Sequence, residues 1–97
     1  MKKLNLARKV LNLDGTENND STGRALAHFL ANSTGQDGSR SVKLWDWSIA
    51  AFNDKPIMID ASDEDWLRNF IDKHPQMPVW LKSQVLNRLG EAVEAGE

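Results

Sequence analysis

The chain has 97 residues and no cysteine, and its hydrophobic fraction of 40% includes four tryptophans and three phenylalanines. This length fits one small domain with a single core, and the lack of cysteine excludes disulfides, thiolate catalysis and cysteine-based zinc sites. A formal net charge of −2 argues against a large phosphate-binding surface. We expect one domain over residues 1–97, with residues 1–3 and 91–97 frayed, in a cytoplasmic, reducing compartment.

The N-terminal segment from Leu4 to Leu13 has an extended apolar pattern and ends at the turn signal Asp14-Gly15. A hairpin and a lone edge strand both fit this pattern. The chain begins with two lysines, but polar residues such as Arg8 interrupt the apolar run that a secretory signal needs. No stretch reaches the roughly 20 apolar residues of a membrane span, so we expect no membrane contact.

The next two elements are predicted to be helices separated by a loop. The first helix runs from Thr22 to Asn32 and is capped by Ser21 or Asp20. The stretch from Asn32 to Ser41 is rich in glycine and hydroxyl residues, which indicates a mobile loop. The second helix runs from Val42 to Asn53, with Ser41 as its cap.

The second helix carries two apolar stripes. One stripe contains Val42, Trp45, Ile49 and Phe52, and the other contains Leu44, Trp47 and Ala51. A helix that is apolar on two faces is expected at the centre of the domain, contacted from both sides. Trp45, Ile49 and Phe52 of the first stripe are assigned to the core. Trp47 points about 160° away from Trp45 and either packs in a second layer or faces outward.

A strand and a third helix follow. The run from Ile57 to Ile59 is short and of β type, and we expect it to pair with the N-terminal segment. The third helix is predicted to begin at Ser62, with Asp65 in the capping-box position. It ends by His74, because the residue before a proline disfavours helix.

The last helix is predicted from Pro78 to about Gly90. Its apolar arc faces the core, whereas Trp80 projects beside Gln84 and Asn87 on the face expected to meet water. An exposed tryptophan on a small domain is typical of a protein contact. The alternative is that the ring folds back over the turn from Pro75 to Pro78.

Together these elements predict a mainly helical α+β fold with about four helices and a small two-stranded β element. The expected core combines apolar residues of all four helices and the second strand. Its members are Leu26, Phe29, Leu30, Trp45, Ile49, Phe52, Ile57, Ile59, Trp66, Phe70, Leu81, Val85 and Leu89.

No motif for catalysis or metal binding is found. The loop from Asn18 supplies oxygen atoms at EF-hand positions, but Phe29 occupies the place of the closing glutamate. The carboxylates of residues 60–65 sit at a helix start, where capping and the helix dipole account for them. His28 and His74 lack a metal-binding spacing. We expect no catalytic residue, no metal site and no cofactor.

The arrangement resembles small proteins of phage and prophage genomes. The shared features are a leader ending in LDG, a helix, a tryptophan-rich helix beginning like KLWDW, a segment like DKPIMID, an acidic helix start like SDEDWL, and a final leucine-rich helix with a central glutamine. The similarity runs from about Leu4 to Leu89. It implies a phage origin and an accessory or morphogenesis role, and it assigns no role to individual residues.

The leading hypothesis is a small non-enzymatic protein-binding or assembly factor, with a foreign protein or a second copy as its partner. The residues expected at the partner surface are Trp80, Gln84, Asn87 and Trp47. The alternative is a nucleic-acid-associated regulator, which would use a basic N-terminal end near Arg24 or Arg40. The basic residues are Lys2, Lys3, Arg8 and Lys9. A third hypothesis is an enzyme subunit whose active site is completed by another chain.

Overall fold

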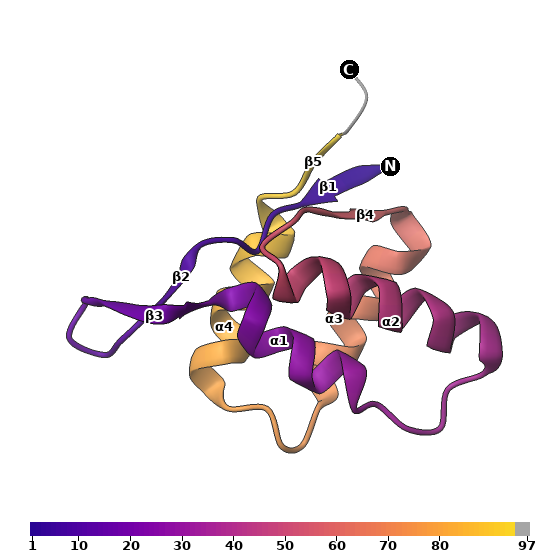
Figure 1. Ribbon diagram of the computed structural model, residues 1–97, viewed down its shortest axis with the longest axis horizontal. Helices are drawn as coiled ribbons and strands as arrows, with labels where there is room; N and C mark the ends of the chain where they lie inside the picture. Colours follow the sequence, from indigo (N-terminus) through magenta and orange to yellow (C-terminus); the bar gives the residue numbers. More distant parts are fainter. Residues whose placement is uncertain (95–97) are drawn as a thin grey trace.

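The computed structural model describes residues 1–94, with Val93 and Glu94 described by their backbone alone. It contains four helices and five short strands in this described part (Figure 1). The elements are β1 (Lys2–Leu4), β2 (Lys9–Leu11), β3 (Glu17–Ser21), α1 (Thr22–Ala31), α2 (Gly38–Phe52), β4 (Ile57–Ile59), α3 (Ala61–Lys73), α4 (Val79–Gly90) and β5 (Val93–Glu94). The prediction of a mainly helical α+β fold is confirmed.

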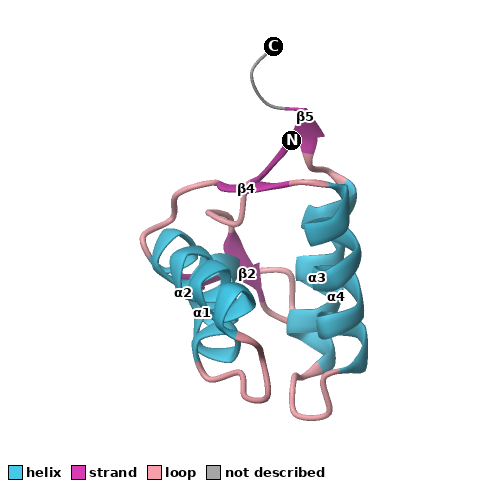
Figure 2. Ribbon diagram, turned by 90° about the vertical axis from the view of Figure 1, so that its right-hand side faces the viewer, coloured by secondary structure: helices cyan, strands magenta, loops and turns pink. Residues whose placement is uncertain are grey.

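The helices form two pairs. Figure 2 shows α1 beside α2 on one side of the molecule and α3 beside α4 on the other, with β4 running across one end of both pairs. Contacts are densest between α1 and α2, and α1 also packs against α4. The core lies between the two pairs.

The strand β1 is the central strand of a three-stranded antiparallel sheet with the order β4-β1-β5. The predicted pairing of the N-terminal segment with Ile57–Ile59 is present, with Leu4 opposite Ile57 and Lys2 opposite Ile59. β5 adds a third strand that the sequence did not predict. Residues 2 and 3, which were expected to fray, lie in this paired strand. Part of the 91–97 segment forms β5, and residues 95–97 lie outside the described residues.

β2 and β3 form a separate antiparallel hairpin, which was one of the two alternatives for the N-terminal segment. Its turn contains Gly15 at a φ of +87°, a conformation that glycine adopts without steric cost. The carboxylate of Asp14 accepts hydrogen bonds from the N–H of Thr16 at 3.0 Å and from its hydroxyl at 2.6 Å. These bonds from Thr16 lower the pKa of Asp14 and hold the turn.

Two helices begin earlier in the sequence than predicted. Asp37, rather than Ser41, caps α2 by accepting a hydrogen bond from the N–H of Arg40 at 2.8 Å, so the helix takes up the end of the expected loop. Asp60, rather than Ser62, caps α3. In both cases an aspartate upstream of the predicted serine supplies the oxygen that the first turn needs.

The largest correction concerns the side of α2 that faces the core. Trp45, Ile49 and Phe52 are 58%, 46% and 47% exposed, so the prediction that this stripe is core is wrong. The opposite stripe is buried, with Trp47 only 6% exposed. On the buried side of α2 the ring of Trp47 meets that of Trp66, and α1 and β4 both pack against this helix.

The remaining core agrees with the prediction in part. Seven predicted residues are buried: Leu26, Leu30, Ile57, Ile59, Leu81, Val85 and Leu89. Phe29, Trp66 and Phe70 are only partly buried and pack around this cluster. Several buried residues were not on the predicted set, among them Leu4, Leu6, Leu44, Leu67, Ile71 and Met77. Of the helices described, none has the length and apolar character to cross a bilayer.

Candidate functional site

A groove lies between the hairpin and the first turns of α4, and we name it the Trp80 groove. It encloses about 850 Å³. Its lining residues are Val10, Leu11, Asn12, Leu13 and Asn18 from the hairpin and Val79, Trp80, Ser83 and Gln84 from α4. The expected exposed position of Trp80 is thus found at the edge of a concave surface.

Large apolar side chains of the Trp80 groove are open to solvent. Leu13 is fully exposed at the hairpin turn, Val79 is 82% exposed, and Trp80 is 45% exposed. Val79 and Trp80 are the first two residues of α4, so the fold projects them from the end of the helix and toward the hairpin. The surface contains an aromatic ring of the kind that dominates protein contacts.

Gln84 holds the two sides of the groove together. Its carboxamide oxygen accepts a hydrogen bond from the N–H of Leu11 at 2.9 Å, and its nitrogen donates to the carbonyl of Leu11 at 3.2 Å. The side chain therefore satisfies the free edge of β2 at this residue. Gln84, expected at the partner surface, lines the groove as a structural clamp, and Asn87 is exposed one turn beyond it without lining the groove.

The lining of the Trp80 groove contains no titratable side chain. Its polar groups are two asparagines, a serine and the glutamine already engaged with the hairpin. Acid–base catalysis needs a titratable group within hydrogen-bond reach of the reacting atom, and the described lining of this groove has none. It suits an uncharged, apolar ligand surface.

Trp47 does not belong to the exposed surface. Of its two alternatives, the packed one is found: the ring is buried, with its centroid 6.4 Å from that of Trp66. Trp66 is stacked on Phe70 at 5.0 Å, and the guanidinium of Arg40 lies 4.8 Å from the Trp66 ring centroid. The expectation that Trp47 binds a partner is therefore corrected.

The carboxylates of residues 60–65 lie at the start of α3, the helix of Trp66, and the contacts of Asp63 show their role. Asp63 is buried and accepts hydrogen bonds from Lys43 at 2.9 Å and Arg40 at 3.3 Å. It also forms a capping box with Asp60. Burial raises the pKa of Asp63, but the bonds from Lys43 and the Asp60 N–H, together with the charge of Lys43, lower it by more, so the carboxyl stays ionised. These carboxylates have a structural role as predicted.

The basic residues of the nucleic-acid hypothesis do not form one surface. Lys2 pairs with Glu64 at 3.0 Å on the sheet side of the molecule. Arg8 and Lys9 instead meet Arg88 of α4 and Glu17, and these residues with Leu11 line a hollow of about 260 Å³. Arg88 donates to both carboxylate oxygens of Glu91 at 3.0 Å, and its Nε–H is buried with no partner in the described part of the chain.

The two additional arginines of that hypothesis are engaged elsewhere. Arg40 is held by the Asp63 network described above. Arg24 donates from Nε to the carbonyl of Phe52 at 3.1 Å, and its guanidinium lies 5.6 Å from the Phe52 ring centroid. Neither side chain joins the hollow around Arg88.

A second apolar surface was missed because three of its four residues were assigned to the core. It consists of Val42, Trp45, Ile49 and Phe52, which we name the α2 stripe, and Val42 is 63% exposed. The sequence signal was present, since two apolar stripes were recognised on this helix. The spacing alone did not say which stripe would be covered, because one face of a helix suffices for packing.

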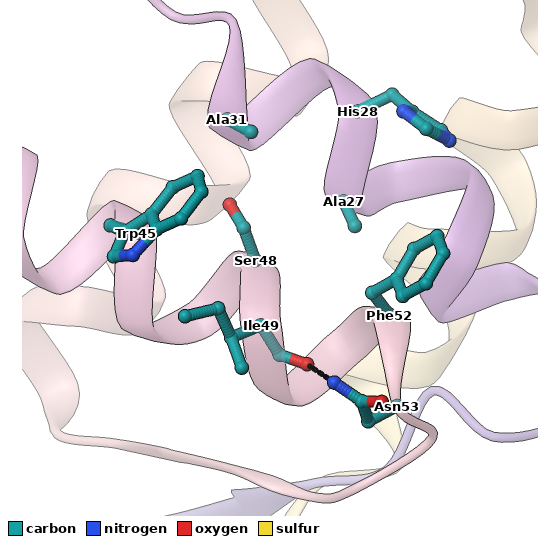
Figure 3. Close-up of a pocket in the computed structure, with 8 residues that line it drawn as sticks. All are labelled: Ala27, His28, Ala31, Trp45, Ser48, Ile49, Phe52 and Asn53. Atoms are coloured by element: carbon teal, nitrogen blue, oxygen red, sulfur yellow. Dashed lines mark hydrogen bonds between the residues drawn. The ribbon is translucent and has the colours of Figure 1, made fainter.

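A hollow of about 230 Å³ lies beside the α2 stripe, between α2 and α1. Figure 3 shows Trp45 at one end, Phe52 at the other and Ser48 between them. Ala27 and Ala31 of α1 form the opposite wall. The small side chains leave this space open, and the hydroxyl of Ser48 is already bonded to the carbonyl of Leu44 at 2.7 Å.

The two histidines make aromatic contacts. His28 meets the ring of Phe52 edge-on with centroids 6.1 Å apart, and His74 meets Phe29 and Phe70 in the same manner at 5.2 Å and 5.3 Å. Within the described residues, no group of three or more His, Cys, Asp or Glu side chains is placed to hold a metal ion.

Comparison of the chain with protein-family models, with curated proteins and with solved structures gave no match in any of the three. Its function is therefore inferred from the side chains and their geometry.

Proposed function

We propose that this protein is a small non-enzymatic protein-binding factor whose partner docks in the Trp80 groove. The observation that carries the proposal is the groove itself, with about 850 Å³ enclosed beside the exposed Trp80, Val79 and Leu13. Exposed apolar patches on small domains mark interaction sites. A tryptophan at the edge of a cavity is the type of residue that contributes most to such contacts.

The chemistry of the lining defines the partner class. Since the lining carries no charge, it offers no ionic attraction to a nucleic acid or a charged peptide. The free edge of β2 is closed at Leu11 by Gln84, so addition of a partner strand at that residue is disfavoured. The partner we expect is a protein segment that inserts one or two apolar side chains beside Trp80. An accessory role in phage assembly, suggested by the sequence resemblance, is compatible with such binding.

Selection of peptides from a random display library tests the proposal. Peptides retained by the wild type are measured by calorimetry against a Trp80→Ala variant, with Trp45→Ala as a matched control of comparable exposure. Truncation of an aromatic anchor is expected to weaken binding by about tenfold or more, while the control binds as the wild type does. Selected peptides with apolar anchors would support the proposal. Peptides that bind Trp80→Ala undiminished would refute it.

One observation supports the nucleic-acid alternative: Arg88, Arg8 and Lys9 line the same hollow. Glu17 and Glu91 lie in the same neighbourhood and offset part of this charge. Binding of fluorescent single- and double-stranded oligonucleotides at low salt tests it. This alternative requires an affinity that falls steeply with salt and is reduced by Lys9→Glu. Absence of binding at low salt removes it.

A further inference from the structure

The α2 stripe has the spacing of a helix–helix seam. Its members follow one another at intervals of three, four and three residues, so that Val42 and Ile49, and likewise Trp45 and Phe52, are seven residues apart. Apolar residues with this heptad spacing are the feature by which two helices pack along a common seam. All four side chains are 46% to 63% exposed, and the ring contacts in the stripe are those of Phe52 with His28 and Arg24, at one end of it.

The stripe and the hollow beside it are complementary in shape. The indole of Trp45 protrudes from α2, and the hollow of about 230 Å³ next to it has room for a large side chain. Its walls are mainly apolar, with Ala27 and Ala31 on the α1 side, and its polar members are His28, Ser48 and Asn53 (Figure 3). One face thus offers both a protruding ring and a hollow to receive one. A two-fold symmetric interface requires such self-complementarity, because each surface meets its own copy.

The charges around the α2 stripe do not favour a strongly charged partner over a second copy of this chain. No Lys, Arg, Asp or Glu lines the hollow, and Asp46 is the one charged residue of α2 that flanks the stripe on the side away from α1. Near Phe52 the charge of Arg24 is met by Asp54 at 3.9 Å. A strongly acidic or basic helix would find no row of opposite charges here, whereas a second copy meets no row of like charges.

We propose that the α2 stripe and its hollow form a dimer interface, with a second copy of this chain as the occupant. Side chains of this size at these exposures offer about 400 Å² of apolar surface per protomer. Pairing two stripes would bury about 800 Å², and the polar rim would bring the total to the lower end of the roughly 1,200–2,000 Å² of specific interfaces. Interfaces at the low end of this range include weak, transient ones, so we expect a dimer that dissociates reversibly on dilution.

Sedimentation velocity over about 5 μM to about 500 μM tests the proposal across a wide range of concentration. The wild type is expected to shift from the monomer mass of 10.9 kDa toward twice that mass as concentration rises. Tryptophan emission should shift to the blue in parallel, because dimerisation removes the indole of Trp45 from water. A wild type that remains monomeric throughout overturns the proposal.

Two matched substitutions locate the interface. Val42→Asp places a charge in the stripe, where the side chain is 63% exposed, and Val79→Asp places the same charge in the Trp80 groove, where it is 82% exposed. Val42→Asp is expected to raise the dissociation constant at least tenfold, and Val79→Asp to leave it unchanged, with circular dichroism confirming that both variants fold. A dimer that survives Val42→Asp but is lost with Val79→Asp overturns the proposal. Peptide binding at the Trp80 groove is measured in a separate experiment. The dimer proposal can therefore be refuted without refuting the proposed function, and the reverse also holds.

Discussion

The side chain of Gln84 in α4 makes two hydrogen bonds to the backbone of Leu11, which lies 73 positions earlier in the chain. At Leu11 these bonds pair the backbone N–H and carbonyl on the outer edge of β2, as a neighbouring strand would do. They attach the hairpin to α4 and so determine the width of the Trp80 groove. The geometry of the candidate site therefore depends on one uncharged side chain.

Replacement of Gln84 by Ala is expected to loosen the hairpin without unfolding the domain. Loss of these bonds should lower the free energy of unfolding by about 1 kcal/mol, because Leu11 is solvent-accessible and water can replace the lost partner. Hydrogen exchange of the Leu11 amide should accelerate. Asn87→Ala, on an exposed position of the same helix, serves as the control and should change neither quantity. Unchanged exchange at Leu11 would contradict the assigned clamp.

The sequence predicted the number of helices, their approximate bounds and the pairing of the N-terminal segment with Ile57–Ile59. These features depend on local signals, namely apolar periodicity, capping residues and turns. It also placed Trp80 on the face expected to meet water, and left open whether the ring folds back over the turn from Pro75 to Pro78. The clamp between Leu11 and Gln84 was not predictable, because a hydrogen bond between residues so far apart leaves no local pattern.

The orientation of α2 could not be read from its pattern. Trp45 and Trp47 lie on nearly opposite sides of the helix, and each belongs to an apolar stripe. The choice between them was made by the tertiary contacts of Trp47 with Trp66 and Arg40. Trp45, the tryptophan of α2 that stays exposed, lies in the proposed dimer interface. The sequence therefore shows that α2 has a second apolar stripe, and the structure shows which of the two stripes is exposed.

Gly23 is predicted to be intolerant of any side chain. A Cβ at this position would lie 2.6 Å from the carbonyl oxygen of Ala51 and 3.1 Å from that of Leu6, so the backbone would have to move. Gly23→Ala should lower the free energy of unfolding by about 2 to 3 kcal/mol through overpacking. Gly38→Ala is the matched control, since it is also in the first turn of a helix but meets nothing within 4 Å.

The control variant Gly38→Ala should instead raise the free energy of unfolding slightly, because alanine is a better helix former than glycine. Urea denaturation measures both variants. Equal effects at the two glycines would contradict the close approach of α1 to the end of α2.

Asp63 makes the stability of the fold sensitive to acid. Its pKa is lowered in the folded state, so its contribution is present above about pH 4 and is lost as pH falls through the folded pKa. Asp63→Asn should cost about 2 to 3 kcal/mol at neutral pH, because Lys43 and Arg40 lose their counter-charge. The difference between wild type and variant should shrink as the pH falls below about 4 and through the lowered folded pKa of Asp63.

Denaturation midpoints from pH 7 to pH 2 check this dependence. Asp65→Asn, at an exposed position two residues later, should not reproduce it. A difference between Asp63→Asn and the wild type that stays constant over this range would show that the carboxylate charge is not responsible.

Truncation of the two neighbouring tryptophans of α2 should give opposite results. Trp47→Ala removes a ring that is 6% exposed and should lower the free energy of unfolding by about 3 to 5 kcal/mol. Trp45→Ala removes a ring that is 58% exposed and should change it by less than about 0.5 kcal/mol. The measurement is made below the concentration at which dimers form, so that lost association does not enter the comparison. Similar losses of unfolding free energy for the two variants would show that Trp45 is a core residue. The basis for an interface on the α2 stripe would then be removed.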